Sequence, residues 1–210
     1  MSSGGVYGDG ETATPHRETD PPRPGNAYER SKLESEHAVI GALAGSNVSW
    51  VILRPAGIYG VDRPATQAFV NDVRTRRVWI HATPHVIVHP THVSDVVQAC
   101  VRATDDRSIT EQIFNVGGER PLAFQELVAL TAAALHVRAP QLVIPTWVGR
   151  PTAVVLESLL RAIKRAAPAS LGRMRRGYVN RSLDIGRARQ ALGFAPMALD
   201  AGLQELSERI

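Results

Sequence analysis

Long apolar runs, cysteine pairs and low-complexity tracts are absent from this chain of 210 residues. No stretch approaches the roughly 18 apolar residues of a membrane span. Residues 1–10 have neither a basic start nor an apolar run, so we expect no signal peptide. Cys100 is the only cysteine, which excludes an internal disulfide and indicates a reducing compartment. We therefore expect a cytoplasmic protein without a membrane span.

The composition that is present is ordinary for a globular protein: 44% hydrophobic and 21% charged, with 17 glycines and 14 prolines. It excludes collagen-like and wholly disordered classes. The length suits one domain, or one domain with a lobe, and is sufficient to bury a core.

Positive charge is unevenly distributed along the chain, whose net charge is +4. Residues 161–189 contain nine Lys or Arg and one acid, Asp184. A solvated face of a basic protein is the favoured interpretation. A phosphate- or nucleic-acid-binding module is the alternative, but no interleaved aromatics, zinc-ligand spacing or recognisable motif accompany the stretch. We expect no nucleic-acid partner.

Hydrophobic periodicity predicts short buried strands that alternate with helices, which is the pattern of an α/β fold with a parallel sheet. The predicted strands are 48–53, 78–81, 85–88 and 112–116, after a short strand end and a proline-rich loop over 1–27. The predicted helices are 26–45, a loop and helix over 54–77, 94–101, 121–135, 148–165, 184–192 and 199–209.

Tyr28 and Lys32 form a Y-x-x-x-K pattern at the start of a predicted helix. Residues four apart share one helix face. A free tyrosine, with a pKa of about 10, is a poor base at neutral pH, and a nearby ammonium group favours the phenolate. A serine hydroxyl from a neighbouring strand end would hold a substrate oxygen beside the phenol. Taken alone, the pattern also fits a surface pair on an amphipathic helix.

Six motifs occur in one order along the chain: SSGGVYG at 2–8, YERSK at 28–32, LRPAGIYG at 53–60, HVSDV at 92–96, FNVGG at 114–118 and ALGFAP at 191–196. In this order they resemble the extended short-chain dehydrogenase/reductase family. Its members include NAD(P)-dependent epimerases, dehydratases and 3β-hydroxysteroid-dehydrogenase-like enzymes. The resemblance covers essentially the whole chain.

The resemblance implies a role for each matching residue. Tyr28 matches the catalytic acid/base, Lys32 the lysine that steadies it and binds the nicotinamide ribose, and Ser3 the catalytic serine that holds the substrate oxygen. Pro55 and Ala56 match the loop that lies against the nicotinamide of NAD or NADP. The expected function is hydride transfer on a secondary alcohol or ketone of a small sugar-like or steroid-like substrate, by an oxidoreductase or an epimerase/dehydratase. A homodimer is common in the resembled family.

The family's glycine-rich phosphate loop is missing from the sequence. We therefore expect the C-terminal half of a Rossmann-type parallel sheet with a small α/β substrate lobe, lacking roughly a hundred upstream residues of βα units. Residues 1–60 would be the catalytic remainder of the Rossmann domain, and 61–210 the substrate lobe with the last strand at about 112–116. The alternative is a truncated, non-catalytic fragment or a subunit that needs an upstream half-domain chain.

A second departure concerns the substrate. Sugar-nucleotide enzymes of the family carry an arginine four residues before the histidine of HVSDV, where this chain has Val88. The absence of this arginine at Val88 favours a smaller or more apolar alcohol as the substrate.

Four histidines gather in one stretch: His81, His85, His89 and His92. Their spacing suggests a metal site, but Pro84 and Pro90 exclude a continuous helix and few carboxylates join them. We expect no metal. For the helix at 148–165, a packed lid or dimer helix is favoured over a membrane-surface helix, because its basic residues lie late in the helix.

Overall fold

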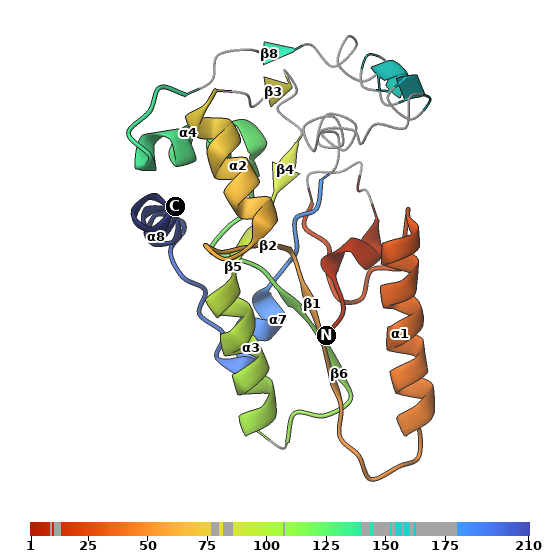
Figure 1. Ribbon diagram of the computed structural model, residues 1–210. Helices are drawn as coiled ribbons and strands as arrows, with labels where there is room; N and C mark the ends of the chain where they lie inside the picture. The colour runs from red at the N-terminus through yellow and green to blue at the C-terminus, as the bar shows by residue number, and fades with distance from the viewer. Residues whose placement is uncertain are drawn as a thin grey trace. The chain divides into compact units, whose positions relative to one another are not determined.

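The computed structural model describes residues 1–8, 10, 14–76, 80–81, 86–106, 108–139, 143–144, 152, 154–156, 158–159, 162 and 180–210. Parallel strands and helices alternate in it (Figure 1), which confirms the α/β fold. The chain divides into two compact units. The first consists of Met1–Gly60, Val88–Pro121 and Asn180–Gly202, and the second of Val61–Ile87, Leu122–Val179 and Leu203–Ile210.

Two parallel strand pairs form the partial sheet of the first unit. β1 (Val51–Pro55) pairs with β6 (Gln112–Val116) residue by residue. β2 (Gly57–Tyr59) pairs with β5 (Pro90–His92). The sequence predicts β6 with its observed bounds, but places β1 about three residues too early and does not predict β2.

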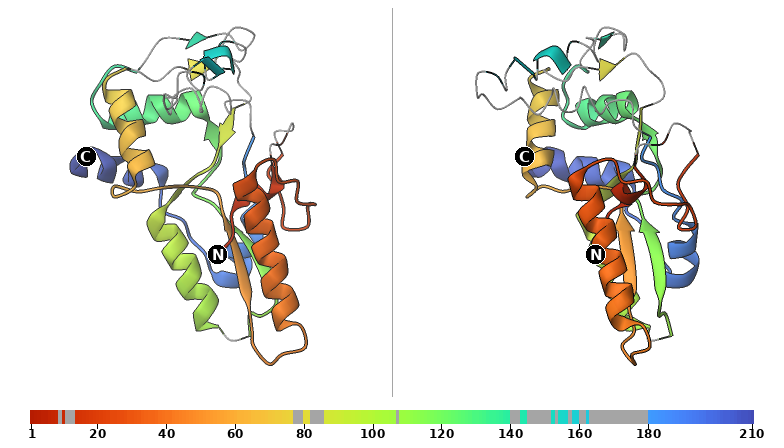
Figure 2. Two further views of the ribbon diagram at one scale, coloured as in Figure 1. Left: turned by 45° about the vertical axis from the view of Figure 1, so that its right-hand side comes forward. Right: turned by 90° about the vertical axis from the view of Figure 1, so that its right-hand side faces the viewer.

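The helices of this unit are α1 (Ala27–Leu43), α3 (Val93–Asp105) and α7 (Gly186–Leu192). Figures 1 and 2 show α1 and α3 on either side of the β1–β6 pair. The packing explains this arrangement, because successive strand residues point to opposite faces. Leu53 packs with Val96 of α3 in one core cluster, whereas Arg54 bonds to Glu36 of α1.

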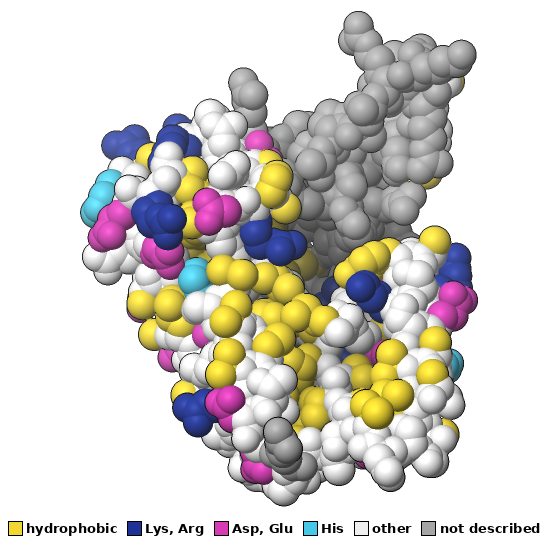
Figure 3. Space-filling model, turned by 60° about the horizontal axis from the view of Figure 1, so that its bottom comes forward, with side chains coloured by type: hydrophobic (Ala, Val, Ile, Leu, Met, Phe, Trp, Pro, Cys, Tyr) yellow, Lys and Arg dark blue, Asp and Glu magenta, His cyan; other side chains and the backbone are white. Residues whose placement is uncertain are grey.

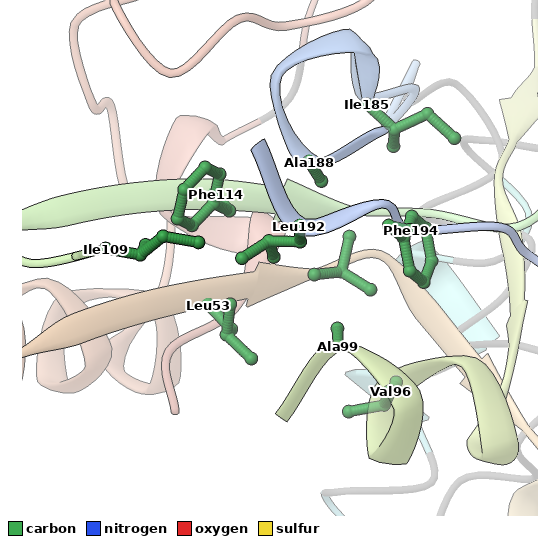
Figure 4. Packing of buried hydrophobic residues seen from close by; sticks show 10 residues of the cluster. Leu53, Val96, Ala99, Ile109, Phe114, Ile185, Ala188, Leu192 and Phe194 are labelled. Carbon is green, nitrogen blue, oxygen red and sulfur yellow. The ribbon is translucent and has the colours of Figure 1, made fainter. Parts of the chain in front are cut away.

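A hydrophobic cluster fills the space on the α3 and α7 side of the sheet (Figure 4). Its buried members are Leu53, Val96, Ala99, Ile109, Phe114, Val116, Ile185, Ala188, Leu192 and Phe194. Phe114, Val116, Ala99 and Ala188 have no exposed surface. Burial of this many aliphatic side chains is the main favourable contribution to the stability of the unit.

The N-terminal segment differs from the expected strand end. Ser2 keeps one sheet-like hydrogen bond, from its N–H to the carbonyl of Leu53 at 2.8 Å, but Gly4–Tyr7 form a 3₁₀ helix, η1. Gly8 follows with φ +76°, where an added Cβ would collide with the carbonyl of Arg23. A glycine is therefore required at this turn.

Helix ends follow local capping chemistry. Asn26 caps α1 with its side chain, at the residue where the sequence predicts the helix to begin, and Gly193 ends α7 in the left-handed region at φ +60°. Helix α3 begins one residue before the predicted start at 94. The sequence favours Ser94 or Asp95 as its cap, but His92 is the N-cap and Asp95 completes a capping box with it. Nitrogen Nδ1 of a histidine accepts hydrogen bonds as a serine oxygen does, which sequence rules for caps do not include.

The second unit contains α2 (Pro64–Arg74) and α4 (Phe124–Ala134), which pack through Val73, Val128 and Ala132. The remaining elements are β3 (Ile80–His81), β4 (Ile87–Val88), β7 (Leu122–Ala123), β8 (Val143–Ile144) and α8 (Leu199–Arg209), which has its predicted bounds. The predicted helix at 148–165, His85 and most of the basic stretch lie outside the described residues. No helix in the described ranges is long and apolar enough to span a membrane.

Candidate functional site

The candidate site lies at the carboxyl end of the β1–β6 pair. Both strands run in the same direction, so the loops after Pro55 and Val116 emerge together, and the Ala56 N–H donates to the Val116 carbonyl at 2.8 Å. The N-terminal turn meets the same edge, since a Cβ added at Gly4 would lie 3.2 Å from the Pro55 carbonyl oxygen. In proteins with an open α/β sheet, ligands bind at the carboxyl ends of the strands.

Ser3 is held in place at the start of η1. Its Oγ accepts a hydrogen bond from the Gly5 N–H at 3.1 Å, which makes it the N-cap of the turn. The side chain is half-buried. A hydroxyl that accepts a bond still has its own hydrogen to donate. The turn therefore fixes the position of the oxygen and leaves its O–H available to a ligand.

Tyr28 and Lys32 lie on one face of α1, as their spacing predicts. The Lys32 Nζ lies 5.7 Å from the centroid of the Tyr28 ring. Tyr28 is 59% exposed although it is large and aromatic. The phenol is thus open to a ligand and has an ammonium group beside it. The catalytic roles of both residues stay a prediction.

Glu29, the residue after Tyr28, was not singled out by sequence reasoning. It is 1% exposed, and its carboxylate accepts hydrogen bonds from the Gly25 N–H and the Arg181 guanidinium, both at 2.8 Å. A Cβ added at Gly5 would lie 3.1 Å from the Glu29 Cγ and 3.3 Å from the Ser3 Oγ. Glu29 therefore joins the start of α1 to the Ser3 turn.

The sequence predicts the position of Glu29 at a helix start, but not its partner Arg181. Asn26 and Glu29 have the spacing of a capping box, which marks Glu29 as a residue of a helix N-terminus. Its side chain bonds to the N–H of Gly25 instead of that of the cap residue. Its second partner, Arg181, is 152 positions away along the chain, so no local pattern could reveal it.

A buried polar network lies next to the Ser3 turn. Arg54 donates to both carboxylate oxygens of Glu36, at 2.9 and 2.6 Å, and to the hydroxyl of Tyr7 at 2.8 Å. The Tyr7 hydroxyl donates in turn to Asn115 Oδ1 at 2.9 Å. Burial raises the pKa of Tyr7, against the lowering effect of Arg54. A protonated Tyr7 satisfies this network, which fixes η1 against both strands.

The rings of His89 and His92 both form hydrogen bonds within the protein. The Nε2 of His89 lies 3.1 Å from the Gly118 carbonyl, and its Nδ1 accepts the Leu183 N–H at 3.2 Å. Burial lowers the pKa of His89, so the ring is neutral with its proton on Nε2. Among the described residues, no three His, Cys, Asp or Glu side chains gather as potential metal ligands.

Comparison with known proteins identifies the family. The sequence model of the NAD dependent epimerase/dehydratase family matches residues 1–117. A chloroplast stem-loop binding protein of 41 kDa (b form) from Arabidopsis thaliana is 28% identical over 145 residues, which is 68% of this chain and 37% of that protein. The methionine adenosyltransferase 2 subunit beta of Bos taurus is 27% identical over 138 residues, 62% of this chain and 40% of that protein.

Solved structures show the same fold. The protein gox2253 superimposes with a TM-score of 0.76 at 19% identity, over 99% of this chain and 64% of its own. UDP-glucose 4-epimerase of Thermotoga maritima, solved with UDP-glucose, gives 0.73 at 21% identity, over 99% and 61%. MoeE5, solved with UDP-glucuronic acid and NAD, gives 0.69 at 25% identity, over 99% and 62%.

These relatives are all longer than the region they share with this chain, which spans 37% to 40% of the curated proteins it matches. Relatives have been solved with NAD or NADPH, and the matching family is NAD-dependent. The family match covers more than half of the 210 residues. The chain belongs to the NAD-dependent epimerase/dehydratase family, within the extended short-chain dehydrogenases/reductases.

Proposed function

We propose that this chain is the catalytic and substrate-binding part of an NAD(P)-dependent epimerase/dehydratase or dehydrogenase that acts on a secondary alcohol or ketone. The observation that carries the proposal is the pairing of an exposed Tyr28 with Lys32 on α1. The Ser3 turn, which Glu29 links to α1, lies at the carboxyl end of the sheet. This set of groups has the chemistry of a proton-transfer site for a carbinol oxygen.

In the proposed reaction, the substrate hydroxyl lies between Ser3 and Tyr28. Ser3 donates its O–H to the substrate oxygen, since the bond that its Oγ accepts from the Gly5 N–H leaves this hydrogen available. The Tyr28 oxygen takes the hydroxyl proton as the alcohol becomes a ketone, and returns it in the reverse direction. The Lys32 ammonium stabilises the negative charge on Tyr28. Bound NAD or NADP supplies the acceptor or donor of the hydride.

The residues at this edge fit the nicotinamide end of such a cofactor. Lys32 would hold the ribose, and Pro55 and Ala56 would lie against the nicotinamide ring. Pro55 has no N–H and that of Ala56 is bonded to Val116, so these two residues would offer the cofactor apolar side chains and carbonyl oxygens but no backbone N–H. The sequence offers no glycine-rich loop for the diphosphate.

The substrate class has two candidates. Val88 stands where a charged clamp for a sugar-nucleotide diphosphate is expected, and it favours a smaller or more apolar alcohol. The structural relatives solved with UDP-glucose and UDP-glucuronic acid favour a nucleotide sugar. A screen for turnover should therefore contain both classes.

A non-catalytic role, as a fragment or a subunit that needs an upstream half-domain, is the second candidate. It is supported by the missing phosphate loop and by the share of the relatives' length that the chain covers. The bovine relative is itself named as a subunit.

The test is a screen of secondary alcohols, ketones and UDP-sugars with NAD(H) and NADP(H), following nicotinamide absorbance and epimer formation. We expect turnover that falls at least about a hundredfold in Tyr28→Phe, since general acid–base groups contribute roughly 10²–10⁴-fold. Tyr59→Phe is the matched control, because it makes the same change at a tyrosine that packs edge-on against His92. Equal activity of Tyr28→Phe and the parent protein would refute the assignment.

A further inference from the structure

Glu29 is a buried acid beside the residues of the proposed site. Acidic side chains normally lie at the surface, where Figure 3 shows several of them open to solvent. Glu29 is only 1% exposed. One of its carboxylate oxygens accepts the Gly25 N–H and the other accepts the Arg181 guanidinium, each at 2.8 Å. Both oxygens are thus bonded to the protein, so Glu29 acts on the site through its contacts and not as a base.

The side chain of Glu29 occupies the space above Gly5. A Cβ added at Gly5 would lie 3.1 Å from the Glu29 Cγ and 3.3 Å from its Oε1, and also 3.3 Å from the Ser3 Oγ. Carbon atoms in favourable contact lie about 3.5–4.0 Å apart. A methyl group therefore fits at Gly5 only if Glu29 or Ser3 moves. The two side chains meet over the backbone of this glycine.

The same glycine holds the Ser3 hydroxyl. The Gly5 N–H donates to the Ser3 Oγ at 3.1 Å, and Gly5 belongs to η1, in which every residue is buried. A displacement of Gly5 would therefore displace the Ser3 Oγ as well. Glu29 contacts Gly5 from the first turn of α1, one position after Tyr28. The placement of the Ser3 oxygen relative to that turn thus depends on Glu29.

Arg181, the cation that pairs with Glu29, belongs to a segment that also packs on η1. Leu183, two residues further along the chain, is buried in one cluster with Val6 and Tyr7 of η1. Its Cδ1 would lie 2.8 Å from a Cβ added at Gly4. The segment is therefore fixed against the same turn, and Arg181 holds the Glu29 carboxylate from a firm support.

We propose that Glu29 is a positioning residue of the proton-transfer site: its side chain sets the Ser3 hydroxyl relative to Tyr28, and Arg181 holds Glu29 in place. The inference rests on the proposed function and adds to it a residue that acts through Ser3. Misplacement of a reacting group by about 1 Å can lower a rate about a hundredfold. A change at Glu29 should therefore lower kcat, while the KM for NAD or NADP should change little.

The first measurement needs no substrate. The NMR signals of Ser3 are compared among the parent protein, Gly5→Ala, Glu29→Ala and the double variant. Glu34→Ala is the matched control, because it removes an exposed carboxylate from the same helix. We expect Gly5→Ala to shift the Ser3 signals, since the new Cβ presses on both Glu29 and the Ser3 Oγ. The control should leave them unchanged.

The double variant should return the Ser3 signals toward their parent positions, because Glu29→Ala removes the Cγ against which the Cβ of Gly5→Ala collides. Ser3 signals displaced as far in the double variant as in Gly5→Ala would overturn the proposal. So would Ser3 signals that stay unchanged in all three variants.

The second measurement is the effect of Glu29→Gln on turnover, in the parent protein and in Ser3→Ala. This change keeps the length of the side chain and removes its charge. We expect kcat to fall about tenfold in the parent protein and less than about twofold in Ser3→Ala, where the hydroxyl to be positioned is absent. General damage to the fold would lower kcat by the same factor in both proteins, and that result contradicts a role through Ser3.

The two measurements distinguish this inference from the proposed function. Equal turnover by Tyr28→Phe and the parent protein would refute the proposed reaction, but it would not alter the Ser3 signals, which are recorded without substrate. Those signals then decide by themselves whether Glu29 places the serine.

Discussion

The Arg181 guanidinium donates to the carboxylate of Glu29 at 2.8 Å, and Glu29 is the residue after Tyr28, the proposed acid/base. Glu29 is almost fully buried, whereas the Arg181 side chain is 38% exposed. The pair connects the segment after Asn180 to the first turn of α1. The orientation of that turn, and of Tyr28 on it, depends on a contact formed only in the folded chain.

Removing either partner of this pair should destabilise the protein. Glu29→Ala eliminates a buried acceptor for Gly25 and Arg181, and we expect a loss of about 2–3 kcal/mol in the free energy of unfolding. Arg181→Ala should cost at least as much, since it leaves the buried Glu29 carboxylate without its cation, whereas water reaches the Arg181 guanidinium that remains in Glu29→Ala. Urea unfolding of both single variants and the double variant measures the coupling. Strictly additive effects would show that the pair contributes nothing.

The buried hydrogen-bond network around Arg54 predicts a larger loss of stability when its ion pair is broken. Arg54 and Glu36 are 4% and 3% exposed, so Glu36→Ala would leave an uncompensated buried guanidinium. We expect a loss of about 3–5 kcal/mol. Tyr7→Phe removes one hydroxyl from the same network and should cost about 1–2 kcal/mol. Chemical unfolding checks both values, and a Glu36→Ala protein as stable as Tyr7→Phe would contradict this order.

Acid should weaken the fold through His89. Burial, partly opposed by its bond to Gly118, lowers the pKa of His89 below its ordinary value of 6.5. The unfolded chain therefore binds this proton more readily than the native protein, and stability falls as the pH drops below about 6.5. Protonation would also place a hydrogen on the Nδ1 that accepts the Leu183 N–H.

The measurement for His89 is urea unfolding at pH 7.5 and 5.5. The parent protein should lose stability between these values, and His89→Phe should lose less. His37→Gln, at an exposed position of α1, is the control and should follow the parent. A parent protein with equal stability at both pH values would refute the role of His89.

Two glycine substitutions should have opposite effects. A Cβ added at Gly117 would collide with the His89 ring, and one added at Gly41 in α1 would meet nothing within 4 Å. Gly117→Ala should destabilise the protein by about 1–3 kcal/mol, whereas Gly41→Ala should stabilise it by about 0.5–1 kcal/mol. Thermal unfolding compares the two variants, and equal shifts of the melting temperature would show that a Cβ at Gly117 can be accommodated beside His89.

Sequence reasoning succeeded where the determinant is local. The short buried-strand pattern of 112–116, which ends at two glycines, predicts β6 with its observed bounds, and the spacing of Tyr28 and Lys32 predicts their shared helix face. It failed where partners are distant in sequence. The pairing of Glu29 with Arg181 and of His89 with Leu183 depends on tertiary packing, and the 3₁₀ turn at Gly4–Tyr7 depends on contacts with α1 and β1.

The most direct test of the account is a titration of the folded, monodisperse protein with NADH and NADPH, following nicotinamide fluorescence and the backbone NMR signals of Ser3, Tyr28 and Lys32. The account predicts saturable binding, with a Kd in the micromolar to millimolar range, that shifts these three signals and weakens about tenfold or more in Lys32→Ala. Absence of binding up to about 10 mM, or equal binding by Lys32→Ala, would contradict the proposal that the carboxyl end of the β1–β6 pair is a nicotinamide site.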